Sequence, residues 1–418
     1  MKELLVKITK VDSLFSDSHL EAVAVIGGGR WARVLLEVLC SVVPGSIEIS
    51  AHSPRNSHAM SEWVLGSELE NRIQVYSDYP KVVADKKVAL IVVNAARDHE
   101  KAIEWALSKQ LPVLVEKPVT LSFSATQRMA ELAIRQDTYF AAAHVFLFAS
   151  YIESFSRLIL SQKNIVSIRV FWSDPTSERR YGESKNYDAG LPVYADWLPH
   201  ILSILGSFMV GLPQLRKNIL FMDGGSRLNI KLFYEKIPCS IELIRNGKSR
   251  KRIFEVSTEQ QKHTLDFGVE PGVIYTDSNA LPDNPDWSDE PGPVAKMLSA
   301  FLQGVACDVR DQRLDISIGL SSGQLIDQVG LIYRDCLFYW LNEEFHRCYD
   351  DISISMNYAL TELLTMHDSD SVVPVDQRIM YIYQHLKDLF SIVSDESSQY
   401  IEHAIELIIE QGKNSSYS

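Results

Sequence analysis

The hydrophobic pattern of the first 145 residues alternates between short buried runs and longer helical periods. Apolar runs of strand length begin at residues 21, 46, 88 and 111, and polar or glycine-rich positions follow each of them. Between the first two runs, apolar residues from Trp31 to Leu39 recur at the three- and four-residue spacing of a helix. Strands that alternate with helices of this length form right-handed βαβ units. The pattern therefore predicts a doubly wound parallel sheet over residues 21–143.

The pattern changes after about residue 145. Between residues 166 and 259 apolar and polar positions alternate at period two, with polar turns between the runs. Such alternation predicts a mostly antiparallel sheet with one solvated or interface face, in a second α/β domain over 144–335. Apolar stripes such as Ile379, Ile382 and Leu386 then predict a helical extension over 336–418, and residues 1–20 are expected to form an N-terminal extension.

Composition narrows the class of protein. The chain has 418 residues, of which 46% are apolar and 23% are charged, as in soluble proteins of two or three domains. The net charge of −13 argues against nucleic-acid binding, which needs clustered cations. There is no apolar run of the roughly 20 residues that span a membrane, and no secretory signal pattern. Five scattered cysteines without CxxC spacing predict a cytoplasmic protein with no disulfide framework and no metal site.

The run "AVIGGGRWA" contains Gly27-x-Gly29-x-x-Ala32 between a strand and a helix. The first glycine permits a tight turn, the second lets the backbone approach a pyrophosphate, and the small third residue lets helix and strand pack closely. The helix N-terminus supplies N–H groups to the anion. We therefore expect a dinucleotide site that includes Arg30 and Trp31, although a merely structural turn has the same spacing.

The end of the second strand bears on which dinucleotide binds. An NAD site normally has an acid there to hold the ribose 2′-hydroxyl, but this chain has His52 and Ser53, with Arg55 close behind. Arg55 could pair with a 2′-phosphate while Ser53 donates a hydrogen bond, which favours NADP(H) over NAD(H). Alternatively, Arg55 is a solvated loop charge.

Two further segments carry candidate chemistry. "VLVEKP" ends a buried strand with Glu116 and Lys117, at the sheet edge where ligands bind, although an exposed loop lysine is equally compatible. "YADWLPHILSILG" places Asp196 and His200 at i and i+4, on one face of a helix expected to begin near Asp196 or Trp197. Pro199 would then lie in the first turn. The alternative is a helix-dipole acid beside a packed core histidine.

Together these segments resemble the glucose–fructose oxidoreductase, inositol dehydrogenase and MocA (Gfo/Idh/MocA) family over roughly residues 20–335. The resemblance rests on "VIGGGRWA", "VLVEKPVTLS", "AAAHVFLFASY" and "ADWLPHILSILG", in this order. It implies a Rossmann domain followed by an α/β domain with an open sheet. It also implies hydride transfer between a nicotinamide and a hydroxyl or carbonyl carbon of a sugar, sugar nucleotide or cyclitol, in a homo-oligomer (a dimer or tetramer).

The resemblance also implies roles for individual residues. Lys117 would hydrogen-bond the reacting oxygen and stabilise alkoxide character, and His200 would be the general acid/base. Asp196 would orient His200 or hold a neighbouring substrate hydroxyl, and His144 would contact cofactor or substrate unless it is a packed hinge histidine. The cofactor site would also include the following residues: Asn94, His99, Glu116 and Lys117.

The chain departs from the family pattern near the substrate. A frequent Asp is replaced by Ser203, a glycine by Leu198, and the usual Thr-Pro by Ala95-Ala96. These departures put the substrate in doubt, although "DWLPH" and "AHVFLFASY" look closest to the branch acting on nucleotide-linked sugars. Two alternatives stay open: an imine reductase of the thiazolinyl type, and an inactive NADP-binding regulator or scaffold.

Overall fold

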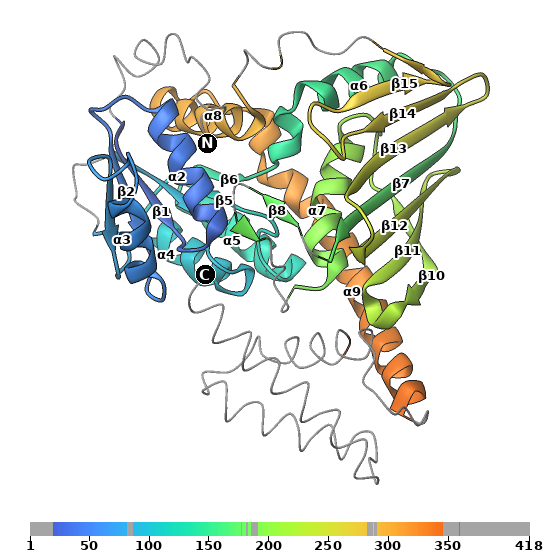
Figure 1. The fold of residues 1–418 in the computed structure, drawn as a ribbon, viewed down its shortest axis with the longest axis horizontal. Helices are drawn as coiled ribbons and strands as arrows, with labels where there is room; N and C mark the ends of the chain where they lie inside the picture. Colours follow the sequence, from blue (N-terminus) through green and yellow to red (C-terminus); the bar gives the residue numbers. More distant parts are fainter. Residues whose placement is uncertain are drawn as a thin grey trace.

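The computed structural model describes residues 20–81, 87–176, 178–180, 183–184, 191–281, 287, 291–345 and 359. The first part comprises β1 (Leu20–Ile26), α2 (Arg30–Val42), β2 (Glu48–His52), α3 (Ser57–Leu65), β3 (Ile73–Tyr76), β4 (Lys87–Val92), η1 (Ala96–Asp98), α4 (His99–Ser108), β5 (Val113–Val115), α5 (Phe123–Arg135) and β6 (Phe140–Ala142). Figure 1 shows these elements on the left.

The second part begins with η2 (Val145–Phe148), α6 (Ser150–Leu160), β7 (Ile165–Pro175), β8 (Arg179–Arg180), β9 (Glu183–Ser184) and α7 (Val193–Gly206). It continues with β10 (Gln214–Met222), η3 (Asp223–Gly225), β11 (Arg227–Tyr234), β12 (Ile237–Gly247), β13 (Lys251–Thr258), β14 (Lys262–Asp266), β15 (Val273–Thr276) and β16 (Asn279–Ala280). The last described elements are α8 (Pro293–Cys307), η4 (Gln312–Leu314) and α9 (Ile316–Phe345).

The first sheet has the strand order β3-β2-β1-β4-β5-β6, with all neighbours parallel. β1 lies in its middle and is buried on both faces except at Glu21, which explains its nearly continuous apolar sequence. The predicted doubly wound parallel sheet is therefore confirmed. The sequence pattern missed β3, a four-residue edge strand, and β6, which is only three residues long. Neither strand is long enough to show a period of its own.

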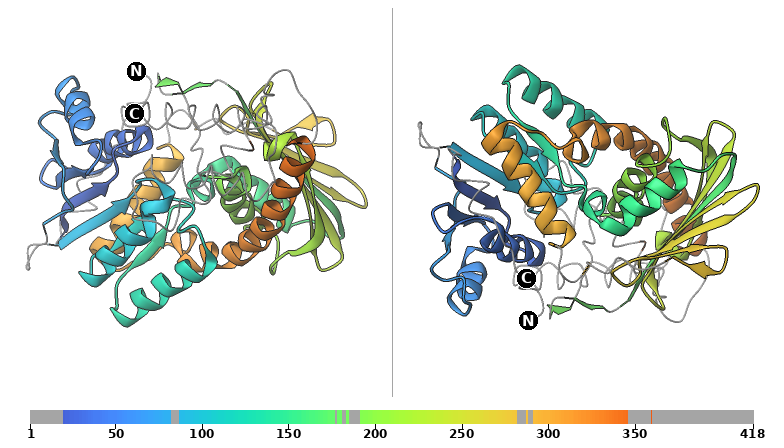
Figure 2. Two further views of the ribbon diagram at one scale, coloured as in Figure 1. Left: turned by 90° about the horizontal axis from the view of Figure 1, so that it is seen from below. Right: turned by 90° about the horizontal axis from the view of Figure 1, so that it is seen from above.

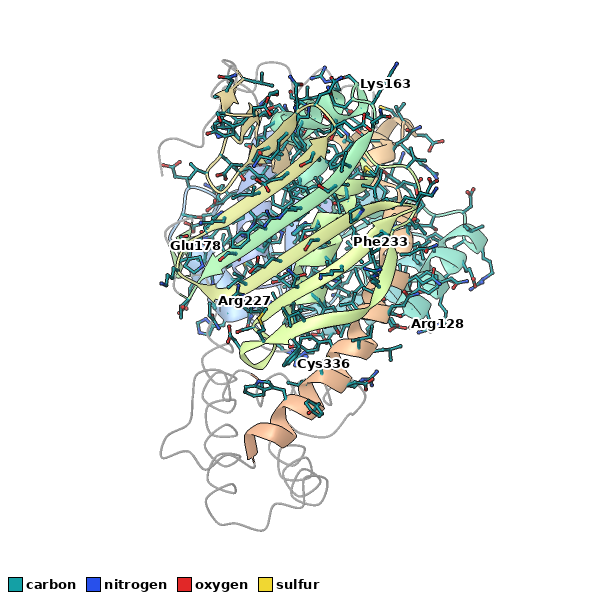
Figure 3. The ribbon with its side chains drawn as sticks, turned by 90° about the vertical axis from the view of Figure 1, so that its right-hand side faces the viewer. Arg128, Lys163, Glu178, Arg227, Phe233 and Cys336 are labelled. Atoms are coloured by element: carbon teal, nitrogen blue, oxygen red, sulfur yellow. The ribbon has the colours of Figure 1, made fainter. Side chains whose placement is uncertain are left out.

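The second sheet has eight strands in the order β10-β11-β12-β7-β13-β14-β15-β16. Only β12 and β7 run parallel, so the prediction of a mostly antiparallel sheet is confirmed. Along β12 and β13 buried positions alternate with more accessible ones, because one face packs on helices and the other faces away from them. Figure 3 views the outward face, and Figure 2 shows the helices on the inward side.

Two C-terminal helices join the two sheets. α8 returns to the first domain, where Met297, Leu298 and Phe301 are fully buried in the same cluster as Leu35 of α2. α9 then packs against α5, α7 and β10, and its Asp327 accepts a hydrogen bond from the backbone N–H of Phe123 at 2.9 Å. The helix between 293 and 307, which the sequence pattern assigns to the second domain, thus packs on the first one.

α9 also crosses the expected boundary at residue 335 without interruption and places Leu337 in the core of the second domain. The apolar stripes from Ile379 onward lie outside the described residues, as do residues 1–19 of the expected N-terminal extension 1–20, whose last residue, Leu20, begins β1. In the described part of the chain, no helix combines the length and apolarity needed to cross a membrane.

Candidate active site

The glycines of the phosphate loop have different surroundings. A Cβ added to Gly27 would lie 2.8 Å from Val93 Cγ1 and 2.9 Å from the Val93 carbonyl carbon, so this position admits only glycine. Among the described residues no atom lies within 4 Å of a Cβ added to Gly29, so they leave room where a pyrophosphate would approach. Ala32 is fully buried in the close packing of α2 on the sheet.

The N-terminus of α2 suits an anion. The helix begins at Arg30, its first turn has no acidic residue, and within the described residues no side chain hydrogen-bonds as its N-cap. Its first N–H groups and the positive end of the helix dipole therefore face the open space beside Gly29. These features fit a dinucleotide phosphate.

The end of β2 carries the residues expected to choose the cofactor. Ser53 is buried, and its hydroxyl accepts a hydrogen bond from the Asn56 backbone N–H at 3.1 Å. The side chain of Arg55 is 65% exposed and lies 3.4 Å from Asp98 of η1. His52 is held structurally, since its ring stacks on Tyr76 with centroids 5.0 Å apart. Arg55 is thus an exposed cation near the phosphate loop, and it forms an ion pair with Asp98.

His99 and Asn94 join two loops at the C-terminal edge of the first sheet. The ring of His99 is buried, with Nδ1 2.8 Å from the Pro118 carbonyl oxygen and Nε2 3.0 Å from the Asn94 carbonyl oxygen. Burial lowers the pKa of His99, and the hydrogen bonds to carbonyls oppose that effect. His99 therefore ties the loop after β4 to the loop that carries Lys117.

Glu116 connects the phosphate loop to Lys117. Its Oε1 accepts a hydrogen bond from Trp31 Nε1 at 2.7 Å, and its Oε2 accepts one from the Lys117 backbone N–H at 3.1 Å. Burial raises the pKa of Glu116, while Trp31 and Lys117 oppose the rise. The carboxylate thus fixes the backbone of Lys117 relative to the first turn of α2.

Lys117 and Asp196 meet directly across the two domains. Lys117 Nζ donates to Asp196 Oδ1 at 2.5 Å and to the Asp196 backbone oxygen at 2.8 Å. These contacts use two of the three ammonium N–H donors and leave the third for another acceptor. Asp196 Oδ2 accepts a hydrogen bond from Arg245 Nη2 at 3.0 Å. Although burial raises the pKa of Asp196, Lys117 and Arg245 together hold it well below its usual range.

His200 lies one turn further along α7 in aromatic surroundings. Its ring packs edge-on against Phe146, with centroids 4.8 Å apart, and parallel to Trp172, with centroids 6.1 Å apart. Among the described residues no hydrogen bond joins its ring to Asp196. Burial lowers the pKa of His200 well below its usual value and Lys117 lowers it further, while Asp196 opposes both. The imidazole is therefore neutral near pH 7 and able to accept a proton.

His144 follows β6 and lies at the crossing between the domains. It is 2% exposed, and neither ring nitrogen has a hydrogen-bond partner among the residues that the structure describes. Burial lowers the pKa of His144 to about 4. It is close enough to His200 to contribute to the lowered pKa of that residue.

The helix that carries Asp196 and His200 begins earlier than the sequence predicts. α7 starts at Val193, with Pro192 as its N-cap, so Pro199 lies inside the helix rather than in its first turn. The prediction of a start near Asp196 or Trp197 is therefore wrong. The apolar Val193 and Tyr194 are buried in the core of the second domain, and this packing extends the helix toward its N-terminus. Asp196 still falls in the first turn.

Arg245 is a site residue that the sequence reasoning missed. It lies on β12, on the same face as Ile241 and Leu243, whose side chains are fully buried. A charged residue at an apolar-face position is rarely buried without a partner. This break in the alternation was a usable signal.

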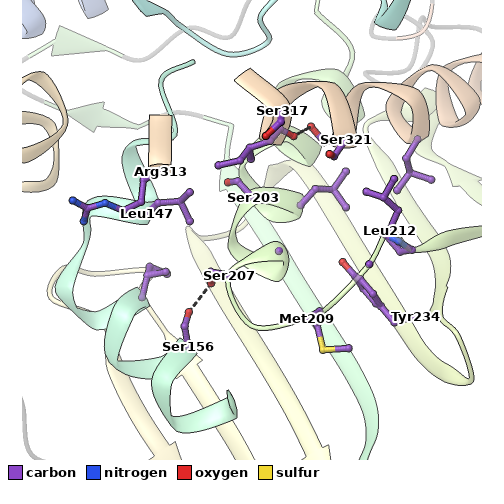
Figure 4. A pocket seen from close by; sticks show the side chains of 18 of the residues that line it. Leu147, Ser156, Ser203, Ser207, Met209, Leu212, Tyr234, Arg313, Ser317 and Ser321 are labelled. Carbon is purple, nitrogen blue, oxygen red and sulfur yellow. Dashed lines mark hydrogen bonds between the residues drawn. The ribbon is translucent and has the colours of Figure 1, made fainter. Parts of the chain in front are cut away.

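A separate cavity of about 1010 Å³ lies at the other end of α7, between α6, α7 and α9 (Figure 4). Its walls include Ser156 and Ser207, whose hydroxyls hydrogen-bond at 2.6 Å, together with Met209 and Ser321. Lys117, Asp196 and His200 do not line it. The candidate site is the group of contacts around Lys117.

Residues 22–144 match the model of the Gfo/Idh/MocA family, described as an oxidoreductase family with an NAD-binding Rossmann fold. This Rossmann domain belongs to that family. The match includes the phosphate loop, Glu116, Lys117 and His144. The chain therefore carries the nicotinamide-dinucleotide-binding domain of an oxidoreductase family. No curated protein matches the chain.

Solved structures share the fold at low identity. UDP-N-acetylglucosamine 3-dehydrogenase from Acidithiobacillus ferrooxidans aligns with a TM-score of 0.60 at 16% identity, over 74% of this chain and 97% of its own. A 3-ketoreductase from Actinomadura kijaniata, in complex with TDP-benzene and NADP, aligns with a TM-score of 0.60 at 16% identity, over 74% and 96%. A dehydrogenase from Clostridium difficile aligns with a TM-score of 0.59 at 13% identity, over 74% of this chain and 98% of its own. At these identities the likeness shows the fold.

Proposed function

We propose that this chain is an NAD(P)-dependent oxidoreductase that transfers hydride between a nicotinamide and a hydroxyl or carbonyl carbon of a sugar nucleotide, with NADP(H) favoured. The observation that carries the proposal is the contact of Lys117 with Asp196, one helical turn from His200. This contact lies at the C-terminal edge of a parallel sheet whose phosphate loop fits a dinucleotide. Ligands of open α/β sheets bind at this edge.

The residues divide the chemistry between them. When bound, the nicotinamide supplies or accepts the hydride at the carbon that bears the oxygen. The free N–H of Lys117 donates to that oxygen, and its positive charge stabilises the negative charge that develops there. His200 takes the hydroxyl proton in the oxidative direction and returns it in the reductive direction. Asp196 holds the ammonium group of Lys117 in place.

The substrate class rests on the structural neighbours. The dehydrogenase from Acidithiobacillus ferrooxidans acts on UDP-N-acetylglucosamine, and the ketoreductase from Actinomadura kijaniata binds TDP-benzene and NADP. Both proteins align with this chain over almost their whole length. We extend the nucleotide-linked sugar to this chain as part of the proposal, together with a preference for NADP(H) based on Arg55.

The decisive experiment measures oxidation of NADPH by the full chain with UDP- and dTDP-linked keto-sugars, with the alcohol product identified by mass spectrometry. We expect one alcohol per NADPH consumed, and a turnover about 10²- to 10³-fold lower in Lys117→Met with cofactor binding retained. Near-normal turnover in Lys117→Met would contradict the role of Lys117. NADPH binding without reduction of any keto-sugar would favour a scaffold, and reduction of a thiazoline imine alone would favour an imine reductase.

We also propose a cytoplasmic homo-oligomer built on the outward face of the second sheet. Leu220, which is 57% exposed, lies on this face, as do the partly buried Phe171, Phe233 and Ile253. These apolar side chains lie on the face that points away from the helices, and we propose them as contacts between subunits. Light scattering should give a dimer or tetramer, and Leu220→Glu should shift it toward the monomer. A monomeric wild type would contradict the proposal.

A further inference from the structure

Arg245 projects from β12 onto the inward face of the second sheet, and its side chain is 3% exposed. Its guanidinium donates hydrogen bonds both to α7 and to the segment that precedes it. Nη2 donates to Asp196 Oδ2 at 3.0 Å, and Nη1 donates to the Leu191 backbone oxygen at 2.9 Å. The guanidinium also lies 5.7 Å from the ring centroid of Trp197. Arg245 therefore binds both the carboxylate and the segment that leads into its helix.

The two oxygens of Asp196 serve two different cations. Oδ1 accepts from Lys117, and Oδ2 accepts from Arg245, so the carboxylate cannot rotate without losing one of them. His200, one turn away on the same helix face, would be the alternative partner of a released carboxylate. Hydrogen bonds between ionised groups are about twice as strong as neutral ones, which favours the observed arrangement.

A second buried arginine provides a contrast. Arg252 on β13 is 4% exposed, pairs with Asp174 and lies 4.2 Å from the ring centroid of Trp172. It also donates to the Ser173 backbone oxygen at 2.6 Å. Its acidic partner, Asp174, belongs to β7 of the sheet, whereas the acidic partner of Arg245 belongs to α7, the helix that also carries His200. Both arginines are buried on this face, so burial does not distinguish Arg245. Its contact with Asp196 does.

We propose that Arg245 is a positioning residue for the reaction, because it commits the Asp196 carboxylate to Lys117 and keeps it away from His200. The inference rests on the proposed function in so far as Lys117 and His200 act on the substrate. Arg245 holds the carboxylate, the carboxylate holds the ammonium group, and the free N–H of Lys117 then points in one direction. His200 meanwhile stays uncharged and available as the proton acceptor.

The test compares Arg245→Met and Arg245→Lys with Arg227→Met as a matched control. Arg227 is also a sheet arginine paired with an acid, at 2.7 Å from Glu242, but its side chain is 42% exposed on the outward face. Three quantities are measured: kcat and KM with a keto-sugar nucleotide, the Kd for NADPH, and the titration of His200 by NMR. The His200 signal is assigned by its absence in His200→Gln.

In Arg245→Met we expect kcat to fall about 10- to 100-fold, as for a misplaced catalytic group, with KM and the Kd for NADPH within about twofold. The charged and titratable groups that act on His200 are Lys117, Asp196, His144 and Arg252. Since Arg245 no longer neutralises or holds Asp196, the pKa of His200 should rise. Arg245→Lys should restore part of kcat and most of the His200 titration. Arg227→Met, compared in the same oligomeric state because Arg227 shares the outward face with Leu220, should match the wild type.

The inference is overturned if Arg245→Met keeps the wild-type kcat and His200 titration. It is also overturned if Arg245→Met loses activity only in proportion to unfolded protein, with an unchanged His200 titration in the folded fraction. Should Arg245→Met not fold, Arg245→Lys decides alone, because a positioning role predicts an intermediate kcat and a small rise in the pKa of His200. Should the wild type reduce no keto-sugar, the proposed function fails, while the titration still tests the positioning.

Discussion

Trp31 Nε1 donates a 2.7 Å hydrogen bond to Glu116 Oε1, across 85 positions of the chain. Trp31 belongs to the first turn of α2, and Glu116 precedes Lys117, so this bond couples the phosphate loop to the lysine of the candidate site. A buried carboxylate that loses a donor costs free energy because it cannot recover the bond from water.

Trp31→Phe should therefore lower the free energy of unfolding by about 1–3 kcal/mol and weaken NADPH binding. Denaturant titration and quenching of protein fluorescence by NADPH measure the two effects. Trp63→Phe, in α3 of the same domain, is the control for loss of a tryptophan. If Trp31→Phe matches the wild type in both measurements, the proposed coupling is wrong.

Gly27 and Gly29 should respond differently to alanine. Gly27→Ala forces a methyl group within 3 Å of Val93, so it should lower the free energy of unfolding by about 1–3 kcal/mol. The methyl group of Gly29→Ala meets no atom of the described residues within 4 Å and should leave stability unchanged, while it blocks the approach of a phosphate. Calorimetry of both variants, with and without NADPH, checks this. Gly29→Ala should unfold at the wild-type temperature without NADPH and should lose the stabilisation that NADPH gives to the wild type. Full NADPH binding by Gly29→Ala would argue against a phosphate at this loop.

Arg55 should decide the preference for NADP(H). Its guanidinium is exposed and shares its charge with Asp98 at 3.4 Å, so a 2′-phosphate would compete with that acid. We expect Arg55→Ala to weaken NADPH binding about tenfold and to leave NADH binding unchanged, as a lost charged hydrogen bond implies. Asp98→Asn should strengthen NADPH binding. Equal effects of Arg55→Ala on both cofactors would instead identify it as a solvated loop charge.

The pH dependence of alcohol oxidation should follow the neutral state of His200. Its pKa is lowered, so the residue stays deprotonated below pH 6.5 and the acid limb of kcat/KM should lie below that value. Because the Lys117 ammonium lowers this pKa, Lys117→Met should move the limb of the residual activity to higher pH. Steady-state rates between pH 4 and 8 test this expectation. An acid limb at or above 6.5 would show that another group is the base.

His144 should make stability depend on pH. Its pKa falls from 6.5 in the unfolded chain to about 4 in the folded one, so the unfolded state binds the proton first as the pH drops. The stability contributed by the neutral ring is full above pH 6.5 and is lost between 6.5 and about 4. The loss amounts to about 3 kcal/mol. His144→Leu should flatten this part of the curve in denaturant titrations, and an unchanged slope would contradict the assignment.

Local patterns were enough for much of the fold. The apolar runs predicted β1, β2, β4 and β5, because each of these signals is contained within a few residues. The alternation of such runs with helical periods predicted the parallel sheet. β3 and β6 escaped since they are too short to show a period. The start of α7 was misplaced because its first turn is stabilised by burial of Val193 and Tyr194 in a core that assembles from distant segments.

The sequence by itself determined which groups were available: a glycine loop before a helix, a lysine at the end of a buried strand, and an acid and an imidazole on one helix face. The tertiary structure decided how they pair. Lys117 reaches Asp196 across 79 positions, and Asp196 reaches Arg245 across 49. Helical spacing alone could equally have joined Asp196 to His200. The outcome depends on which cations the folded chain brings to the carboxylate, because ionised partners in a buried site bind more strongly than a neutral imidazole.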